Sequence, residues 1–165
     1  MITALSTSVD DTRRLAAEVA AMAKPGDLLV LAGDLGVGKT AFAQGFAQAL
    51  GVAELVTSPA FVLLRTYEGR LRMSHLDVYR MDHLQELIDL GMSELLDEGG
   101  VVLVEWGDVV LPALPADFLE VRIEHGSSDD ERRVAIDVVG PAWAPRMTAL
   151  ELALVPWSVT GGSPC

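Results

Sequence analysis

The chain has 165 residues, of which half are hydrophobic and only 5% aromatic, so we expect one domain with a largely aliphatic core. Its 24 acidic residues against 12 Lys and Arg give a formal net charge of −12. Proteins that grip a nucleic-acid backbone unaided carry a basic face, so this charge balance disfavours strong direct binding of nucleic acid.

The one cysteine, Cys165, excludes an internal disulfide and a Cys-rich metal site. The first residues are polar and then amphipathic, unlike a secretory signal, and no apolar run reaches the length of a membrane span. These features are consistent with a cytoplasmic protein that makes no membrane contact.

A first helix is expected from the S-x-x-D pattern of Ser8 to Asp11, a common helix start. Leu15, Val19 and Met22 follow on one face, and Lys24-Pro25-Gly26 ends the helix. We expect this apolar face to pack on a sheet.

The next segment has the strand–loop–helix context of a phosphate-binding loop. Leu28 to Ala32 is an apolar run suited to a strand that is buried on both faces. Gly33 to Thr40 has the P-loop pattern G-x-x-x-x-G-K-T. Apolar residues then recur at helical spacing from Phe42 to Leu50, and Gly51 stands where a helix would end.

The glycines of such a loop have a mechanical role. Gly36 and Gly38 are able to adopt positive φ angles, which point backbone N–H groups inward as an anion nest. The helix adds its N-terminal N–H groups, Lys39 reaches the β- and γ-phosphates, and Thr40 is a ligand for Mg²⁺. A glycine-rich turn with no ligand is the alternative, but the flanking strand and helix favour the phosphate site. The residues expected to bind the nucleotide are Asp34, Leu35, Gly36, Val37, Gly38, Lys39, Thr40 and Ala41.

A hairpin and two short helices are expected after the P-loop helix. Strands over residues 61–67 and 70–76 flank a Glu-Gly turn, and short helices over 84–88 and 93–98 end at glycines. Val101 to Glu105 then gives four aliphatic residues and a carboxylate, a further buried strand.

The segment from His75 to Arg80 is dense in side chains that can do chemistry. In an extended segment His75, Asp77 and Tyr79 share one face. Asp77 is suited to orient an attacking water or to hold Mg²⁺ through water, and Arg80 is suited to counter phosphate charge. An Asp–Arg pair at a strand end, with His75 and Tyr79 as partly buried polar groups, is an equally open interpretation.

Glu105 stands at the end of its expected strand, where open α/β sheets bind ligands. In P-loop proteins an acid at this end of a strand beside the loop holds Mg²⁺ or its water shell. We therefore interpret Glu105 as a metal-side carboxylate in preference to a solvated strand end. Trp106 is either a lid over the site or a packing residue, and packing is the simpler interpretation.

Two alternating runs near the C-terminus, 119–124 and 134–138, predict an antiparallel hairpin and hence a mixed sheet. The expected architecture is a three-layer, P-loop NTPase-like α/β fold with a mixed central sheet and an antiparallel C-terminal hairpin. We divide the chain into an ATPase domain, residues 1–139, and a Pro- and Gly-containing tail, residues 140–165, which is either flexible or docked.

Four stretches together resemble the TsaE (YjeE-type) ATPases of bacterial tRNA threonylcarbamoyladenosine synthesis. They are Gly33 to Thr40, Ser58-Pro59-x-Phe61, His75-x-Asp77-x-Tyr79-Arg80 and Val104-Glu105-Trp106. The resemblance covers about residues 5–139. It implies a cytoplasmic subunit that depends on ATP and Mg²⁺, joins a TsaD-type transferase and its TsaB-type partner, and supports transferase turnover.

The resemblance also implies roles for particular residues. Lys39 and Thr40 would bind phosphate and Mg²⁺, Glu105 would be a metal-side carboxylate, and Asp77 would be needed for hydrolysis. The segment from Ser58 to Phe61 looks like a switch. The residues assigned to a switch or partner face are Ser58, Pro59, Phe61, His75, Tyr79, Arg80 and Trp106.

The chain departs from the family pattern at two places. It has Ala60 where the family commonly has Thr, which removes a hydroxyl from the switch segment. It has Gly107-Asp108 after the tryptophan, where the family commonly has Pro-Glu. Both departures concern the switch and partner contacts and leave the P-loop unchanged.

Two other functions fit a P-loop. A small kinase would transfer the γ-phosphoryl group to a metabolite, but it usually needs a mobile basic lid, and no arginine-rich stretch stands out. A GTP-binding switch would need a guanine-reading Asn-Lys-x-Asp sequence, which this chain lacks.

Overall fold

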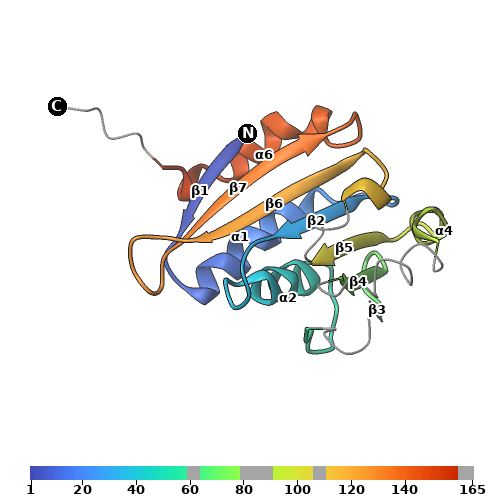
Figure 1. The fold of residues 1–165 in the computed structure, drawn as a ribbon, viewed down its shortest axis with the longest axis horizontal. Helices are drawn as coiled ribbons and strands as arrows, with labels where there is room; N and C mark the ends of the chain where they lie inside the picture. Colours follow the sequence, from blue (N-terminus) through green and yellow to red (C-terminus); the bar gives the residue numbers. More distant parts are fainter. Residues whose placement is uncertain (59–63, 79–90, 106–110, 160–165) are drawn as a thin grey trace.

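The computed structural model describes residues 1–58, 64–78, 91–105 and 111–159, and Figure 1 shows how their helices and strands are arranged. The strands are β1 (Ile2–Ser6), β2 (Leu28–Ala32), β3 (Leu64–Tyr67), β4 (Met73–Asp77), β5 (Val101–Glu105), β6 (Phe118–His125) and β7 (Arg132–Val139). The helices are α1 (Val9–Ala21), α2 (Lys39–Ala49), α4 (Met92–Asp97) and α6 (Met147–Ala153), with short 3-10 helices at Leu111–Ala113, Ala144–Arg146 and Val155–Trp157.

The described strands form one mixed sheet in the order β1-β7-β6-β2-β5-β4-β3. β2 runs parallel to both of its neighbours, β5 and β6, and β4 runs parallel to β5. β6 and β7 pair antiparallel, as do β3 and β4 and also β1 and β7. The predicted mixed sheet and antiparallel C-terminal hairpin are therefore confirmed.

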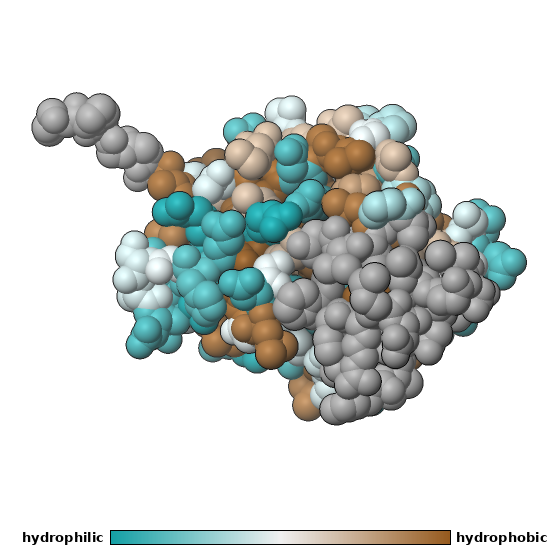
Figure 2. Space-filling model, in the orientation of Figure 1, coloured by the Kyte–Doolittle hydropathy of each residue, from teal (hydrophilic) through white to brown (hydrophobic). Residues whose placement is uncertain are grey.

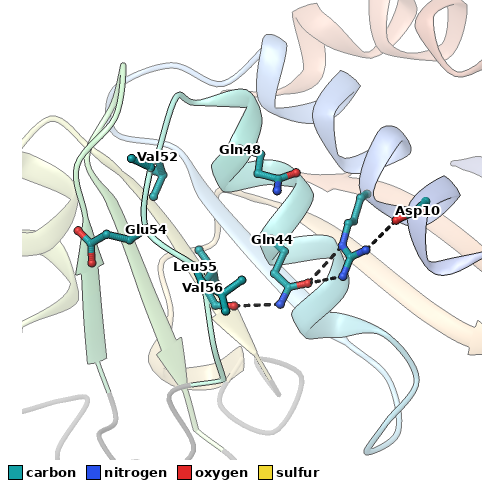
Figure 3. Close-up of a pocket in the computed structure, with 9 residues that line it drawn as sticks. Asp10, Gln44, Gln48, Val52, Glu54, Leu55 and Val56 are labelled. Atoms are coloured by element: carbon teal, nitrogen blue, oxygen red, sulfur yellow. Dashed lines mark hydrogen bonds and ion pairs between the residues drawn. The ribbon is translucent and has the colours of Figure 1, made fainter.

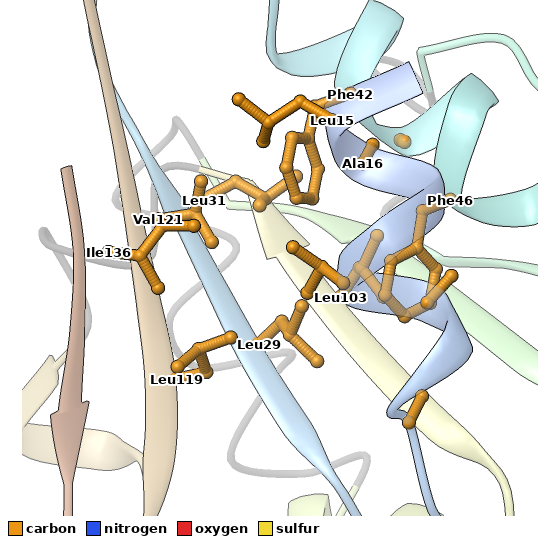
Figure 4. Close-up of a cluster of buried hydrophobic side chains, with 14 of the residues drawn as sticks. Leu15, Ala16, Leu29, Leu31, Phe42, Phe46, Leu103, Leu119, Val121 and Ile136 are labelled. Carbon is orange, nitrogen blue, oxygen red and sulfur yellow. The ribbon is translucent and has the colours of Figure 1, made fainter. Parts of the chain in front are cut away.

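The aliphatic sequence of β2 and β5 is explained by cover on both faces of the sheet. Every residue of these two strands is buried. On one face, side chains from β2, β5 and β6 meet those of α1 and α2, and Figure 4 shows Leu103 beside Phe46. On the other face, a smaller cluster joins the sheet to α4 and to the 3-10 helix at Leu111–Ala113. The result is the predicted three-layer arrangement.

The start of α1 is formed as its sequence pattern predicts. The Ser8 hydroxyl accepts a hydrogen bond from the Asp11 backbone N–H at 3.0 Å, and the Asp11 carboxylate accepts one from the Thr7 N–H at 3.0 Å. These two bonds satisfy backbone donors that the first turn of a helix leaves unpaired. The first turn of α1 is thus fixed by side chains that lie within five residues of each other in the sequence.

The strand predicted over residues 70–76 differs in its bounds from β4, which begins at Met73, and all five residues of β4 are buried. Arg70 lies outside the strand: its backbone N–H donates to the carbonyl of Leu50 after α2, and its guanidinium donates to the carbonyl of Ala20 at 2.9 Å, near the end of α1. Arg72 pairs instead with the exposed carboxylates of Glu68 and Glu98. The helix predicted over 84–88 lies outside the described residues.

Residues 140–158 pack against the rest of the fold in this structure. Trp143, Leu150 and Leu154 are buried in the larger core cluster. Arg146 stacks over the Trp143 ring at 3.9 Å and forms two hydrogen bonds to the Asp27 carboxylate, at 2.6 and 2.8 Å. The division of the chain at residue 139 stays a prediction.

The surface in Figure 2 has hydrophilic and hydrophobic residues interspersed over the part that is described. Among the large apolar side chains that remain exposed, Leu35 in the P-loop is 84% exposed and Leu55 is 76% exposed. None of the helices in the described ranges is long and apolar enough to cross a lipid bilayer.

We expect Arg146→Ala to lower the free energy of unfolding by about 3–5 kcal/mol, because it leaves the carboxylate of Asp27 buried without its cation. The Asp27 side chain is only 4% exposed, and that of Arg146 11%. Urea unfolding of both proteins measures the difference. Arg72→Ala is the matched control, since that guanidinium is 47% exposed and its loss costs about 0–1 kcal/mol. Equal losses in the two variants would contradict this account.

Candidate functional site

The loop between β2 and α2 has the backbone geometry of an anion-binding nest. Gly36 and Gly38 have φ angles of 76° and 121°, which side chains with a Cβ rarely adopt. No described atom lies within 4 Å of where a Cβ would stand on either residue, so the space beside them is open to a ligand. Gly38 is also the N-cap of α2 and provides no side-chain cap, which leaves the first N–H groups of the helix for an anion.

Lys39 places its ammonium within this loop. The side chain is buried, and Nζ donates to the carbonyl oxygens of Gly33 at 2.6 Å and Asp34 at 2.9 Å. A buried ammonium requires acceptors of this kind, because desolvation of a charge is otherwise costly. The positive charge is thus held at the base of the loop by the loop's own backbone.

The carboxyl ends of β4 and β5 bring further polar side chains to the same place. The sheet register sets Asp77 directly beside Glu105, and sets Glu105 beside Leu31 of β2. Because paired residues of parallel strands share a face, both carboxylates lie on the α2 side of the sheet with Leu31. Both are also buried. This juxtaposition follows from the strand order and does not need any contact between the two side chains.

Glu105 is the centre of a short chain of polar contacts. Its Oε1 lies 3.0 Å from Nε2 of the fully buried His75 and accepts a hydrogen bond from the Thr40 hydroxyl at 3.4 Å. Nδ1 of His75 has no hydrogen-bond partner within the described part of the chain. His75 and Thr40 both contact Oε1, and together they fix the position of the Glu105 carboxylate.

Asp77 has a similar link to the segment that was interpreted as a switch. The Ser58 hydroxyl donates to Oδ2 of Asp77 at 3.3 Å. The structure therefore gathers Thr40, Ser58, His75, Asp77 and Glu105 at one end of the sheet. Pro59, Phe61, Tyr79, Arg80 and Trp106 lie outside the described residues, so their assigned roles stay predictions.

A cavity of about 100 Å³ lies beside the P-loop. One wall is the P-loop itself with the start of α2, and the opposite wall is the start of α1 and the turn between β6 and β7. Its lining residues are Ser8, Val9, Thr12, Gly36, Val37, Gly38, Ala41, Asp129, Asp130 and Arg132. Of the nucleotide-binding residues that the sequence predicts, Gly36, Val37, Gly38 and Ala41 border this cavity.

Sequence reasoning did not find Arg132, which supports the P-loop from β7. Its Nε donates to the carbonyl of Val37 at 2.7 Å, and its Nη1 donates to the carbonyls of Asp129 and Glu131 at 2.7 and 2.8 Å. The carbonyl of Val37 is thereby turned toward the guanidinium. No local pattern signals this contact, because Arg132 and Val37 are 95 residues apart in the sequence.

A second, larger cavity of about 320 Å³ lies between α1, α2 and the segment that follows α2 (Figure 3). Gln44 crosses it, because Nε2 donates to the carbonyl of Val56 at 3.0 Å and Oε1 accepts from Arg13 at 2.9 Å. Arg13 also pairs with Asp10 at 2.7 Å. The polar groups here bind one another and hold the two helices to residues 52–56.

The donor set fits a nucleotide with a divalent cation better than a cation held by protein alone. Within the described ranges no three His, Cys, Asp or Glu side chains converge as a metal cluster. The hydroxyl of Thr40, at the start of α2, and the carboxylate of Glu105, at the end of β5, suit Mg²⁺, which keeps several waters and takes phosphate oxygens as ligands. The open nest beside Gly36 and Gly38 provides room for those phosphates.

A nest between a buried parallel strand and a helix, with two carboxylates on the neighbouring strands, defines a P-loop NTPase-like α/β protein. The chain belongs to the TsaE family, since the family described as "Threonylcarbamoyl adenosine biosynthesis protein TsaE" matches residues 6–134.

Characterised relatives and a solved structure agree with this membership. The chain is 44% identical to the tRNA threonylcarbamoyladenosine biosynthesis protein TsaE of Bacillus subtilis, over 79% of this chain and 82% of that protein. It is 35% identical to the TsaE protein of Streptomyces coelicolor, over 80% of this chain and 93% of that protein. A crystal structure of YdiB from Bacillus subtilis superposes with a TM-score of 0.76 and 36% identity over 94% of both chains.

Proposed function

We propose that this protein is an Mg-ATP-binding and ATP-hydrolysing subunit that supports a threonylcarbamoyl transferase in the synthesis of threonylcarbamoyladenosine in tRNA. Its partners would be a TsaD-type transferase and a TsaB-type subunit, and its location would be the cytoplasm. The observation that carries the proposal is the meeting of Lys39, Thr40 and Glu105 at an open phosphate nest, in a chain whose relatives are named for this pathway.

Binding of ATP begins with the exchange of hydrogen-bond partners at Lys39. The ammonium now donates to two loop carbonyls, and phosphate oxygens are stronger acceptors because they carry charge. The N–H groups of the nest and of the first turn of α2 bind the same phosphates. We assign the adenosine end to the cavity of about 100 Å³ beside the loop, which Ala41 and Thr12 line.

Hydrolysis needs a water in line with the γ-phosphate and stabilisation of the charge that develops there. Bound Mg²⁺ would neutralise phosphate charge, and Thr40 and Glu105 are the residues suited to hold it. Asp77 is suited to orient the water, because it lies beside Glu105 at the strand end. His75 keeps the Glu105 carboxylate in place through a contact of 3.0 Å, so that little rearrangement is needed when the ligand binds.

The net charge of −12 supports a helper role. A chain with twice as many acids as bases has few cations with which to release counterions from tRNA. The tRNA would then be bound by the transferase subunits, and this protein would act on them. The proposal accordingly expects weak ATPase activity from the isolated chain.

Lys39→Ala tests the phosphate site. We expect Mg-ATP to raise the melting temperature of the wild type, since a ligand that binds only the native state stabilises it. The variant should fold and lose most of this shift, because the phosphates lose their closest cation. Lys24→Ala is the control: it removes the same charge from an exposed position outside the loop. Retention of the full thermal shift in Lys39→Ala would rule out Lys39 as a phosphate ligand.

Asp77→Asn and Glu105→Gln separate catalysis from binding. Each keeps the size of the side chain and removes its charge, so we expect phosphate release to fall by about 10²–10³-fold while ATP affinity changes much less. Asp97→Asn, at an exposed position of α4, should leave both quantities unchanged. Turnover at the wild-type rate in both site variants would refute the assignment, and turnover retained in one would identify the acid that acts.

A titration of purified transferase and partner subunits tests the function itself. The subunits should raise the rate of phosphate release, and no phosphoryl acceptor should be required, which separates this protein from a small kinase. Trp106→Ala should weaken the stimulation more than it weakens ATP binding. The isolated chain should bind tRNA negligibly at physiological salt. Full-speed hydrolysis without partners, or tight tRNA binding by this chain alone, would overturn the proposal.

A further inference from the structure

Trp157 lies outside the range that matches the family, residues 6–134, yet it binds Asp11, a neighbour in α1 of residues that line the cavity assigned to adenosine. Its indole N–H donates to Oδ1 of Asp11 at 2.8 Å across 146 residues of sequence. Asp11 belongs to the first turn of α1, whose N-cap Ser8 and whose residues Val9 and Thr12 line that cavity. A C-terminal side chain is thereby linked to the adenosine cavity through one hydrogen bond.

The backbone around Trp157 is fixed by residues that precede it and follow it in the sequence. Before it, Leu150 and Leu154 are buried against the sheet and α1. After it, Ser158 forms an antiparallel bridge with Ala4 of β1. With the backbone fixed at these points, the hydrogen bond to Asp11 costs little further ordering. The contact therefore fixes the start of α1 relative to the docked segment.

Asp11 also takes part in two hydrogen bonds that involve backbone N–H groups at the start of α1. Its second carboxylate oxygen, Oδ2, accepts from the Thr7 N–H at 3.0 Å, and its own N–H donates to the Ser8 hydroxyl at 3.0 Å. Burial alone would raise the pKa of Asp11, but hydrogen bonds from Thr7, Trp157 and Arg14, with the Arg14 charge, outweigh it and lower the pKa. The carboxylate is therefore charged at neutral pH and binds all three donors.

The groups fixed in this way form the wall that faces the P-loop. Ser8 and Thr12 line a cavity of about 100 Å³ together with Gly36, Gly38 and Ala41. A small shift of the α1 start moves Ser8, Val9 and Thr12 relative to a base in this cavity, whereas the phosphates are bound by Lys39 and by N–H groups of the loop and of α2. Loss of the hydrogen bond between Trp157 and Asp11 should thus weaken the binding of adenosine and leave the binding of triphosphate unchanged.

We propose that Trp157 is a positioning residue for the adenosine end of the nucleotide site, acting through Asp11 on the start of α1. The inference rests on the proposed function, because it requires that the P-loop binds ATP. The docked C-terminal segment, residues 140–158, would then contribute to nucleotide binding as well as to the stability of the fold.

The test compares Mg-ATP with Mg-tripolyphosphate, which carries the phosphates without the nucleoside. Calorimetric titration of Trp157→Phe should give a lower affinity for Mg-ATP than wild type, by up to about fivefold, because the net free energy of the lost hydrogen bond is the most that can be coupled to binding. Its affinity for Mg-tripolyphosphate should be unchanged. Asp11→Ala, which removes the acceptor of both the Trp157 indole and the Thr7 N–H, should show the same pattern and serves if Trp157→Phe does not fold.

Trp143→Phe is the matched control within the same segment. Trp143 is fully buried, but its indole nitrogen has no hydrogen-bond partner among the described residues, so this variant disturbs packing without cutting the link to α1. We expect a lower melting temperature and an unchanged affinity for both ligands. It separates loss of stability from loss of positioning.

The outcomes distinguish this inference from the function on which it rests. If wild type binds neither ligand, the proposed function fails first. If wild type binds both, and Trp157→Phe loses neither affinity or loses both equally, the positioning role is overturned while the phosphate site stands. The ¹⁵N–¹H resonance of the Trp157 indole, assigned by its absence from Trp157→Phe, should shift on addition of Mg-ATP and not of Mg-tripolyphosphate. An indole resonance that ignores both ligands would also overturn the inference.

Discussion

The burial of charge at one end of an aliphatic sheet is the constraint on which the rest of this structure depends. Lys39, Asp77 and Glu105 are each buried beside strands whose other residues are almost all apolar. A buried charge is tolerated only when hydrogen bonds or opposite charges surround it. The loop carbonyls accept from Lys39, the Ser58 hydroxyl donates to Oδ2 of Asp77, and the imidazole of His75 contacts Glu105. Each partner is thereby fixed in a position that suits a ligand.

The elements around this end of the sheet were predictable because their signals are local. The buried strand Leu28–Ala32, the glycine loop and α2 follow one another within 22 residues, and each has its own pattern. Glu105 was identified as a site residue because a carboxylate at the end of an aliphatic strand is conspicuous. The helix start at Ser8 was found for the same reason, since its cap lies three residues from its partner.

The contacts that sequence reasoning missed join residues far apart in the chain. Arg146 reaches Asp27 across 119 residues, and Arg132 reaches Val37 across 95. The local sequence around each arginine does not differ in composition or periodicity from that around a solvent-exposed arginine. Only the order of the strands brings the two side chains to their acceptors. The burial of Ser74 and the start of β4 at Met73, three residues later than predicted, have the same origin, because tertiary contacts override local strand preference.

The bridge between Ala4 and Ser158 bears on how the protein folds. β1 adds to the sheet beside β7, so the first strand in the sequence pairs with the last. Such pairing gives the fold a high contact order, and loop closure over nearly the whole chain precedes any gain from the contact. On a ribosome, β1 and α1 emerge long before their partners, and they cannot complete their edge of the sheet until β7 has been synthesised. The net charge of −12 is suited to that interval, because repulsion between chains opposes the association of unpaired strands while the sheet is incomplete.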